Sequence, residues 1–362
     1  MRHIKFFEEF EYIEELTNKF VKKVGWIMQT NEIAATTGYV SAKETKLNIS
    51  AKGNLFLNFS TKEDFDDDDV VVPNDIPILY YGGSKDKESA AFMKSKKIVK
   101  DNLYNKREIL MMSGDKTQFA KTFKKFDWLP KTVLSKKEAL DGDVGFPVIA
   151  KVKNGHSGKG IEKIDTAKDL EKNKRDFDLF CQFIEFKHEY RVMFCRDKII
   201  VVNERVPTIE DDSSILTKDA ADKISFTYVY QDLNKIDKDF IEQVLKICKD
   251  VKTELDLDLW ALDVVLDTKG KLWVMETSSA TGLGCVKMCE VYKAIYEDFY
   301  KEKLPEDFLK EIYLKYVIPG HQNFYPKRKK EVESSKWPMD YKILTNPKAK
   351  DGYRYFFNLD GK

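Results

Sequence analysis

The sequence predicts a mixed fold of the α+β or α/β class, in which a mixed α/β domain precedes a larger α+β region. Three observations support this prediction. Strand-like apolar runs flank a glycine-rich loop at 154–160, a second pair of such runs flanks a turn near Gly270, and a long amphipathic helix precedes the second pair. Separate groups of paired strands and helices are typical of α+β domains.

The composition sets the broad class of the protein. Its 362 residues suffice for two or three subdomains, and 62 Lys+Arg balance 61 Asp+Glu, so we predict neither a nucleic-acid ligand nor a membrane surface. The first residues do not fit a secretory signal, and no apolar run approaches a membrane span, so a soluble cytoplasmic protein is expected. The five cysteines form no CxxC pair, which argues against a disulfide framework and a structural zinc site. The oligomeric state is left open, with a homodimer as one alternative.

Residues 1–108 are predicted to form the N-terminal domain. An acidic amphipathic helix near Phe6 to Lys23 comes first, and strand-like runs follow at 54–60, 69–73 and 76–81, with a helix-forming stretch after Gly83. The acidic run Asp66 to Asp69 is most simply a solvated loop, and a metal site is the alternative.

The pattern of predicted helices and strands changes from Ser113 onward. A helical period ends before Pro130, which stops a helix and starts an extended segment. The hairpin around the glycine loop follows, and then a helix that opens at Thr166 with the spacing of a capping box. Strands at 179–185, 189–195 and 198–206 lead to a helix of about Lys238 to Glu254. Its apolar face would hold Phe240, Ile241, Val244, Leu245, Ile247, Cys248 and Val251.

The loop "NGHSGKG" at 154–160 is suited to an anion such as phosphate. Glycines allow successive backbone N–H groups to converge on one point, and lysine adds positive charge. The loop is not a Walker A motif, because Lys159 is followed by Gly160 and Ile161 and because a strand follows it. The alternative is a flexible glycine-rich hairpin turn.

The second hairpin, "LDLWALDVVLDTKGKLWVMETSSATGLG", predicts a pair of facing carboxylates. A two-residue turn at Lys269-Gly270 would place Asp263 directly opposite Glu276, on one face with Val265 and Val274. Facing carboxylates repel unless a cation lies between them, and oxygen ligands suit magnesium that arrives with phosphates. The alternative is a solvated hairpin with both acids on its solvent-exposed face.

Four segments in this order and spacing resemble the ATP-grasp superfamily over about residues 113–300, in particular its carboxylate–amine ligases of the D-alanine–D-alanine ligase and RimK-like type. They are "DK" at 115–116, "FPVIAK" at 146–151, "CQFIEFKHEYRV" at 181–192 and "DVVLDTKGKLWVMETSSATG" at 263–282. The resemblance implies an ATP-grasp domain at 109–301, in which two α+β subdomains, 109–180 and 181–301, close on ATP. Residues 302–362 would be a C-terminal extension.

The resemblance also implies a role for each matching residue. Lys116 and Lys151 would bind ATP phosphates, and the loop residues Gly155, His156, Ser157, Gly158 and Gly160 would cover them. Adenine would be bound by Gln182, Phe183, Ile184 and Glu185, and the ribose by Glu189. The transferred phosphate would be contacted by Lys159, Arg191 and Arg205, and the carboxylate substrate is the alternative ligand of Arg191. Magnesium would be held by Asp263, Glu276 and Ser278, where Ser278 and Thr281 stand at the family's asparagine and proline positions. Pairing of the two arginines with Glu189 and Glu204 is the structural alternative.

The implied activity is ATP-dependent ligation of a small-molecule or peptide carboxylate to an amine through an acyl phosphate. A small-molecule kinase and a nucleotide-binding interaction protein without turnover are the alternatives. The basic cluster "YPKRKKEVESSKWP" at 325–338 is either a solvated tail or a clamp for an acidic partner.

Overall fold

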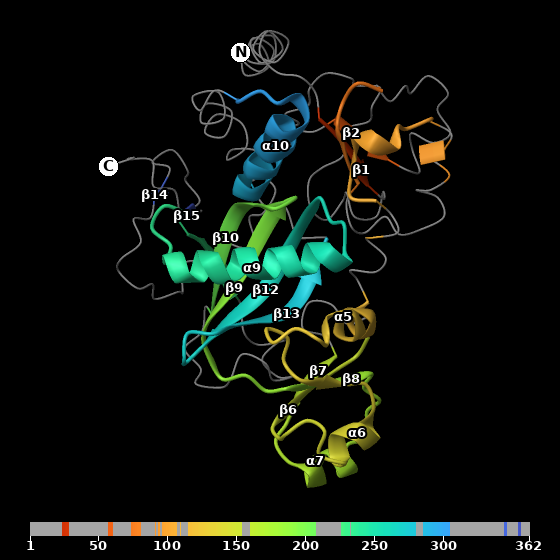
Figure 1. The fold of residues 1–362 in the computed structure, drawn as a ribbon, viewed down its shortest axis with the longest axis vertical. Helices are drawn as coiled ribbons and strands as arrows, with labels where there is room; N and C mark the ends of the chain where they lie inside the picture. Colours follow the sequence, from red (N-terminus) through yellow and green to blue (C-terminus); the bar gives the residue numbers. More distant parts are fainter. Residues whose placement is uncertain are drawn as a thin grey trace, which may run out of the picture. The chain divides into compact units, whose positions relative to one another are not determined.

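The computed structural model describes residues 24–28, 57–60, 74–80, 91, 93–94, 96–106, 109, 115–153, 160–207, 226–231, 233–279, 285–304, 344–345 and 354–355. The chain divides into two compact units (Figure 1), one of residues 1–110, 257–259 and 280–326 and one of residues 111–256, 260–279 and 327–362. The expected N-terminal helix, the acidic run and the basic cluster lie outside the described residues. None of the helices in the described ranges is long and apolar enough to cross a bilayer.

The first unit contains a parallel sheet with the strand order β2-β1-β3-β4. Its strands are β1 (Gly25–Met28), β2 (Leu57–Ser60), β3 (Ile78–Tyr80) and β4 (Leu103–Tyr104). The sequence predicts β2 and β3, whereas β1 and β4 are additional strands. Helix α10 (Cys285–Tyr300) belongs to the same unit, and the Tyr104 hydroxyl donates a hydrogen bond to Asp298 of this helix.

The second unit contains two sheets, of which the first has four antiparallel strands in the order β5-β8-β6-β7. These strands are β5 (Thr132–Val133), β6 (Val148–Lys151), β7 (Ile161–Ile164) and β8 (Leu179–Gln182). The predicted hairpin around the glycine loop is thus confirmed as β6 and β7.

Two short helices begin with capping boxes and cover this sheet. In α7 (Ala167–Lys172) the Thr166 hydroxyl accepts from the N–H of Asp169, as the sequence predicts. In α6 (Lys136–Leu140) the Ser135 hydroxyl accepts from the N–H of Glu138, and the same Ser-x-x-Glu spacing in the sequence is the signal for this helix start. The buried core of this subdomain consists of Ala139, Val144, Val148, Ala150, Ile164, Leu170 and Phe180.

The second sheet has five strands in the order β11-β10-β9-β12-β13. They are β9 (Phe186–Cys195), β10 (Lys198–Pro207), β11 (Phe226–Tyr230), β12 (Leu259–Asp267) and β13 (Leu272–Ser278). Helix α9 (Lys238–Glu254) lies across this sheet (Figure 1), with the bounds that the sequence predicts.

Helix α9 determines which face of the five-stranded sheet is covered. Phe240 of α9 contacts the ring of Tyr190 on β9, with ring centroids 4.9 Å apart. Because side chains alternate along a strand, Glu189 and Arg191 lie on the other face. The helix buries Phe240, Val244, Ile247, Cys248 and Val251, as predicted. The prediction for Leu245 is wrong: this side chain is exposed, since it lies about 100° around the helix from Val244.

Candidate active site

The β12–β13 hairpin closes with a longer loop than the sequence predicts. The N–H of Asp267 donates to the carbonyl of Lys271 at 3.0 Å, which encloses three residues. Gly270, the last of them, has a φ of +84°, the left-handed conformation that ends such loops. The predicted two-residue turn at 269–270 is therefore wrong.

A β-bulge restores the predicted pairing of the two acids. Val264 pairs with Val274 but Asp263 pairs with Glu276, so Met275 is an extra residue on β13. The opposition of Asp263 and Glu276 is confirmed. The predicted register between the bulge and the loop is wrong by one residue, because Val274 lies opposite Val264.

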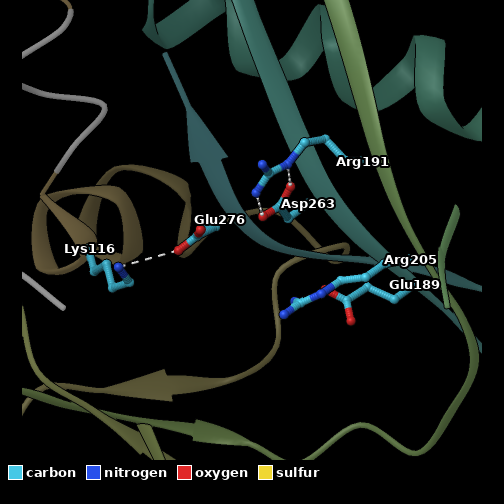
Figure 2. A network of polar contacts seen from close by, with 6 residues as sticks. All are labelled: Lys116, Glu189, Arg191, Arg205, Asp263 and Glu276. Atoms are coloured by element: carbon cyan, nitrogen blue, oxygen red, sulfur yellow. Dashed lines mark hydrogen bonds and ion pairs between the residues drawn. The ribbon is translucent and has the colours of Figure 1, made fainter. Parts of the chain in front are cut away.

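Asp263 is held by Arg191 from the neighbouring strand. Nε of Arg191 donates to Oδ1 of Asp263 and Nη2 donates to Oδ2, each at 2.6 Å (Figure 2). The two side chains are 19% and 12% exposed. Such a two-pronged pair is among the stronger charge-assisted contacts in proteins. Both carboxylate oxygens of Asp263 are thus engaged by one guanidinium group.

Glu276 is paired with Lys116, with 3.3 Å between Nζ and Oε2 (Figure 2). Lys116 is the first residue of α5 (Lys116–Phe123), which Asp115 caps by accepting from the N–H groups of Thr117 and Gln118. The segment after α5 is anchored on the five-stranded sheet, because the carbonyl of Trp128 accepts from the N–H of Val274 at 2.9 Å. These contacts explain how Lys116 reaches β13.

Asp115 has a second partner, the ammonium group of Lys153, 2.9 Å away. Partial burial works to raise the pKa of Asp115, but hydrogen bonds from the Thr117 hydroxyl, from Lys153 and from two backbone N–H groups outweigh it. The pKa of Asp115 therefore falls from 3.8 to about 2. Lys153 directly precedes residues 154–159, so the stem of the glycine loop is linked to the start of α5.

Glu189 and Arg205 form a third ion pair on the same face as Arg191. Nη1 of Arg205 donates to Oε1 of Glu189 at 2.7 Å, which is the structural alternative for Arg205, whereas Arg191 pairs with Asp263 rather than with Glu189 or Glu204. The other oxygen of Glu189, Oε2, is buried without a hydrogen-bond partner among the described residues. Burial raises the pKa of Glu189, although the adjacent Arg205 counteracts it. Oε2 is available to accept a hydrogen bond from a ligand such as a ribose.

Lys151, at the end of β6, is buried at 6% exposure. No ion pair or side-chain hydrogen bond holds its ammonium group within the described part of the chain. An unpaired buried ammonium is costly, and a bound anion would offset that cost. Among the described residues, Lys151 is therefore the one predicted phosphate ligand whose side chain is buried and whose ammonium group has no partner.

The predicted glycine loop is described only at its end. Gly155, His156, Ser157, Gly158 and Lys159 lie outside the described residues. Gly160 has a φ of +81°, and its carbonyl accepts from the N–H of Val152 at 3.0 Å. A Cβ atom at this position would lie 2.2 Å from Cγ2 of Val152, so any other residue would require Val152 to move. The loop is thus closed at its base by a residue whose conformation and close contact with Val152 favour glycine.

The predicted adenine segment joins the two sheets. Gln182 ends β8, and its N–H donates to the carbonyl of Lys131, while the N–H of Phe183 donates to the carbonyl of Pro147. These two backbone donors are therefore used within the protein. Ile184 is buried and Glu185 is exposed. The roles of all four residues stay predictions.

The donor chemistry at Asp263 and Glu276 fits a divalent cation, because two oxygen-bearing acids lie directly opposite each other. Each acid is now neutralised by a protein cation, Arg191 or Lys116. Ser278 lies two residues beyond Glu276 on β13, which puts its hydroxyl on the same strand face. No group of three His, Cys, Asp or Glu side chains that could hold an ion occurs in the described ranges. Phosphate oxygens or water would have to complete the coordination.

Asn203 of β10 was not singled out from the sequence. It pairs directly with Arg191 in the antiparallel β9–β10 register and is fully buried. A signal was available, because Asn203 follows the apolar run 199–202 and precedes Arg205 by two residues, and so shares the face of Arg205.

No protein-family model matches this sequence, and no curated protein matches it. Solved structures do resemble it. The structure of D-alanine–D-alanine ligase from Bacillus anthracis has a TM-score of 0.50 at 14% identity, covering 84% of this chain and 100% of the ligase. N5-carboxyaminoimidazole ribonucleotide synthetase from Thermotoga maritima has a TM-score of 0.48 at 18% identity, covering 79% and 77%. The ATP-grasp ligase PsnB in complex with a minimal precursor has a TM-score of 0.46 at 13% identity, covering 72% and 91%. The likeness to D-alanine–D-alanine ligase confirms the predicted fold.

Proposed function

From the ATP-grasp fold of this chain, we propose that it is an ATP-dependent ligase that joins a carboxylate to an amine through an acyl phosphate. One observation carries the proposal. Within this fold, Lys116 and Arg191 lie against the facing carboxylates Asp263 and Glu276 on one face of the five-stranded sheet (Figure 2). Phosphoryl transfer requires positioning and neutralisation of phosphate oxygens, which is what such a charged cluster can provide.

In the proposed reaction, an oxygen of the substrate carboxylate attacks the γ-phosphorus of ATP. The bond from that phosphorus to the β,γ-bridging oxygen breaks, and ADP leaves. The amine nitrogen then attacks the acyl carbon, and inorganic phosphate leaves as the amide forms and the amine loses a proton to solvent. Lys116, Lys151, Arg191 and Arg205 would bind and orient the phosphate and carboxylate oxygens.

Magnesium would be held by Asp263 and Glu276, with Ser278 as a neutral neighbour. The ion would supply charge neutralisation at the phosphate oxygens when it is bound. Glu189 would bind the ribose through Oε2, and the loop of residues 155–160, Lys159 included, would cover the phosphates. Residues 182–185 would bind the adenine.

One observation favours a second candidate, a nucleotide-binding protein without turnover. Both oxygens of Asp263 are engaged by Arg191, so the acid pair is neutralised without a metal ion. In this case nucleotide would bind but no amide would form.

Mass spectrometry of products separates these candidates. The protein is incubated with ATP, magnesium and pooled amino acids and organic acids, and ADP, phosphate and new masses are measured. An amide product with equimolar ADP and phosphate supports the ligase. A phosphorylated product without free phosphate would indicate a kinase instead, and tight nucleotide binding without ADP would support the second candidate.

A further inference from the structure

Asn203 carries a buried amide whose two polar atoms have no hydrogen-bond partner among the described residues. Its side chain is 0% exposed, and neither Nδ2 nor Oδ1 forms a hydrogen bond with any residue in the part of the chain that the structure describes. Buried polar groups in proteins are almost always paired, because the loss of water contacts is otherwise not compensated. A fully buried amide with both atoms unpaired therefore calls for a ligand that the protein itself does not supply.

The neighbours of Asn203 explain why the amide stays unpaired. Its cross-strand partner, Arg191, is bonded to Asp263 on β12, so the guanidinium is directed away from β10. Arg205, two residues along β10, is bonded to Glu189. Both nearby arginines are thus committed to carboxylates, and the amide of Asn203 lies between them on the face opposite α9.

The chemistry of the amide restricts the ligand. Nδ2 must donate, whereas Oδ1 must accept, so the ligand has to offer both an acceptor and a donor. Ionised phosphate oxygens only accept, and a metal ion offers no donor, so neither satisfies both atoms. A carboxylate with an N–H or O–H on its α-carbon does.

We propose that Asn203 determines the specificity of the carboxylate substrate by binding an α-amino or α-hydroxy acid. This inference rests on the proposed ligase function. Nδ2 donates to the substrate carboxylate beside Arg191, and Oδ1 accepts from the α-ammonium or α-hydroxyl group. A carboxylate without this donor leaves Oδ1 unpaired, and sites of this kind reject such analogues strongly.

The test uses the full-length protein saturated with ADP, so that it does not depend on turnover. The probes are the common α-amino acids, two α-hydroxy acids and the matching carboxylates that lack the α-substituent. Binding is measured as a shift of the thermal unfolding midpoint and then by calorimetry. We expect at least one α-substituted acid to bind, and its unsubstituted analogue to bind at least about tenfold more weakly.

The key variant is Asn203→Leu, which keeps the shape of the side chain and removes both polar atoms. Without ligand its unfolding midpoint should rise by about 2–4 °C, because an unpaired buried amide is lost. Its affinity for the α-substituted probe should fall by about tenfold or more, with ADP affinity unchanged. A structural role alone would change the unfolding midpoint but not the ratio between the two probes.

Thr277→Val is the matched control. Thr277 lies on β13, its hydroxyl is also buried without a hydrogen-bond partner in the described ranges, and its side chain lies on the strand face opposite that of Glu276. This variant should also gain stability but should keep the affinity of the wild type for the probe.

Two binding results would overturn the inference: no α-substituted acid binds, or Asn203→Leu binds the probe as the wild type does. Ligation of a carboxylate without an α-donor would overturn it and leave the proposed ligase function standing. Binding of the probe that depends on Asn203, without any amide product, would overturn the ligase function instead.

Discussion

Arg191 and Asp263 form a two-pronged ion pair across adjacent strands, with both hydrogen bonds at 2.6 Å (Figure 2). In the proposed site, Asp263 is a metal ligand and Arg191 contacts the transferred phosphate. Arg191 is then a competitor of the metal when no nucleotide is bound. Binding of nucleotide would separate the pair, since the phosphate attracts the guanidinium and leaves Asp263 to the ion.

Removal of Arg191 should therefore tighten metal binding to the nucleotide-free protein. We expect Arg191→Ala to bind Mn²⁺ about tenfold more tightly than the wild type, because Asp263 loses its internal counter-ion. Electron paramagnetic resonance of free Mn²⁺ measures this without turnover. Arg205→Ala is the control, because it removes a cation that is paired with Glu189 instead. Unchanged Mn²⁺ affinity in Arg191→Ala, in a folded protein, would contradict the assignment of Asp263.

Glu276→Gln should abolish ATP turnover while leaving the fold intact. The substitution keeps the size of the side chain but removes the negative charge that faces Asp263 and pairs with Lys116. The side chains of Lys116 and Glu276 are 17% and 36% exposed, so the loss of this ion pair should cost at most about 1 kcal/mol of stability. ADP release is measured while magnesium is titrated. Wild-type turnover at saturating magnesium would exclude Glu276 as a ligand.

The pairing of the two acids was predictable from the sequence, but the loop length and the bulge that produce it were not. Asp263 and Glu276 were predicted to face each other from a two-residue turn, but the loop has three residues and a bulge at Met275 shifts the register back. The extra loop residue and the bulge each shift the register by one residue in opposite directions, so Asp263 still lies opposite Glu276. Bulges depend on the local twist and packing of a strand, which the alternation of apolar and polar residues does not reveal.

Elements with strong local signals were predictable, and contacts between distant elements were not. The bounds of α9 follow from an apolar period of about 3.6 residues that is kept over 17 residues. Strand β4 has only two residues and is identified by its parallel pairing with β3. The ion pair of Arg191 with Asp263 joins residues 72 apart in the chain. No periodicity predicts which cation reaches which acid across such a distance.

Lys151→Met should weaken nucleotide binding and stabilise the nucleotide-free protein. The substitution removes one charge-assisted hydrogen bond to phosphate, worth about 1.5–3 kcal/mol of binding. It also removes a buried ammonium that has no partner in the described ranges. Calorimetric titration with a non-hydrolysable ATP analogue and thermal unfolding are the two measurements. Lys125→Met is the control, because Lys125 is exposed and pairs with Glu254. Equal nucleotide affinities in the two variants would rule out Lys151 as a phosphate ligand.

Gly160→Ala should destabilise the protein beyond the cost of its backbone conformation. A left-handed φ costs a non-glycine residue about 1–2 kcal/mol, and the new Cβ would also collide with the branched side chain of Val152 at 2.2 Å. Gly142→Ala is the control, because Gly142 has a φ of +89° with no atom within 4 Å of the added Cβ. Urea unfolding of both variants isolates the collision. The double variant Gly160→Ala, Val152→Ala should recover the difference.

The contribution of Asp115 to stability should vanish in acid. Its pKa in the folded protein is about 2, below the 3.8 of the unfolded chain, so the ionised carboxylate stabilises the folded state above about pH 4. That stability is lost progressively as the pH falls from about 4 to about 2. Because the side chain is 26% exposed, the effect should not exceed about 2 kcal/mol.

Asp115→Asn isolates this effect, because asparagine still caps the helix but carries no charge for Lys153. We expect the wild type to be more stable than Asp115→Asn near neutral pH and the two to converge as the pH falls toward about 2. Denaturant unfolding across this range measures the difference, and all other acids cancel between the two proteins. Lys153→Met should raise the pKa of Asp115 and so reduce the same pH dependence, since one of its hydrogen-bond donors is removed. A difference between wild type and Asp115→Asn that does not change with pH would mean that Lys153 and the helix start leave this carboxylate unperturbed.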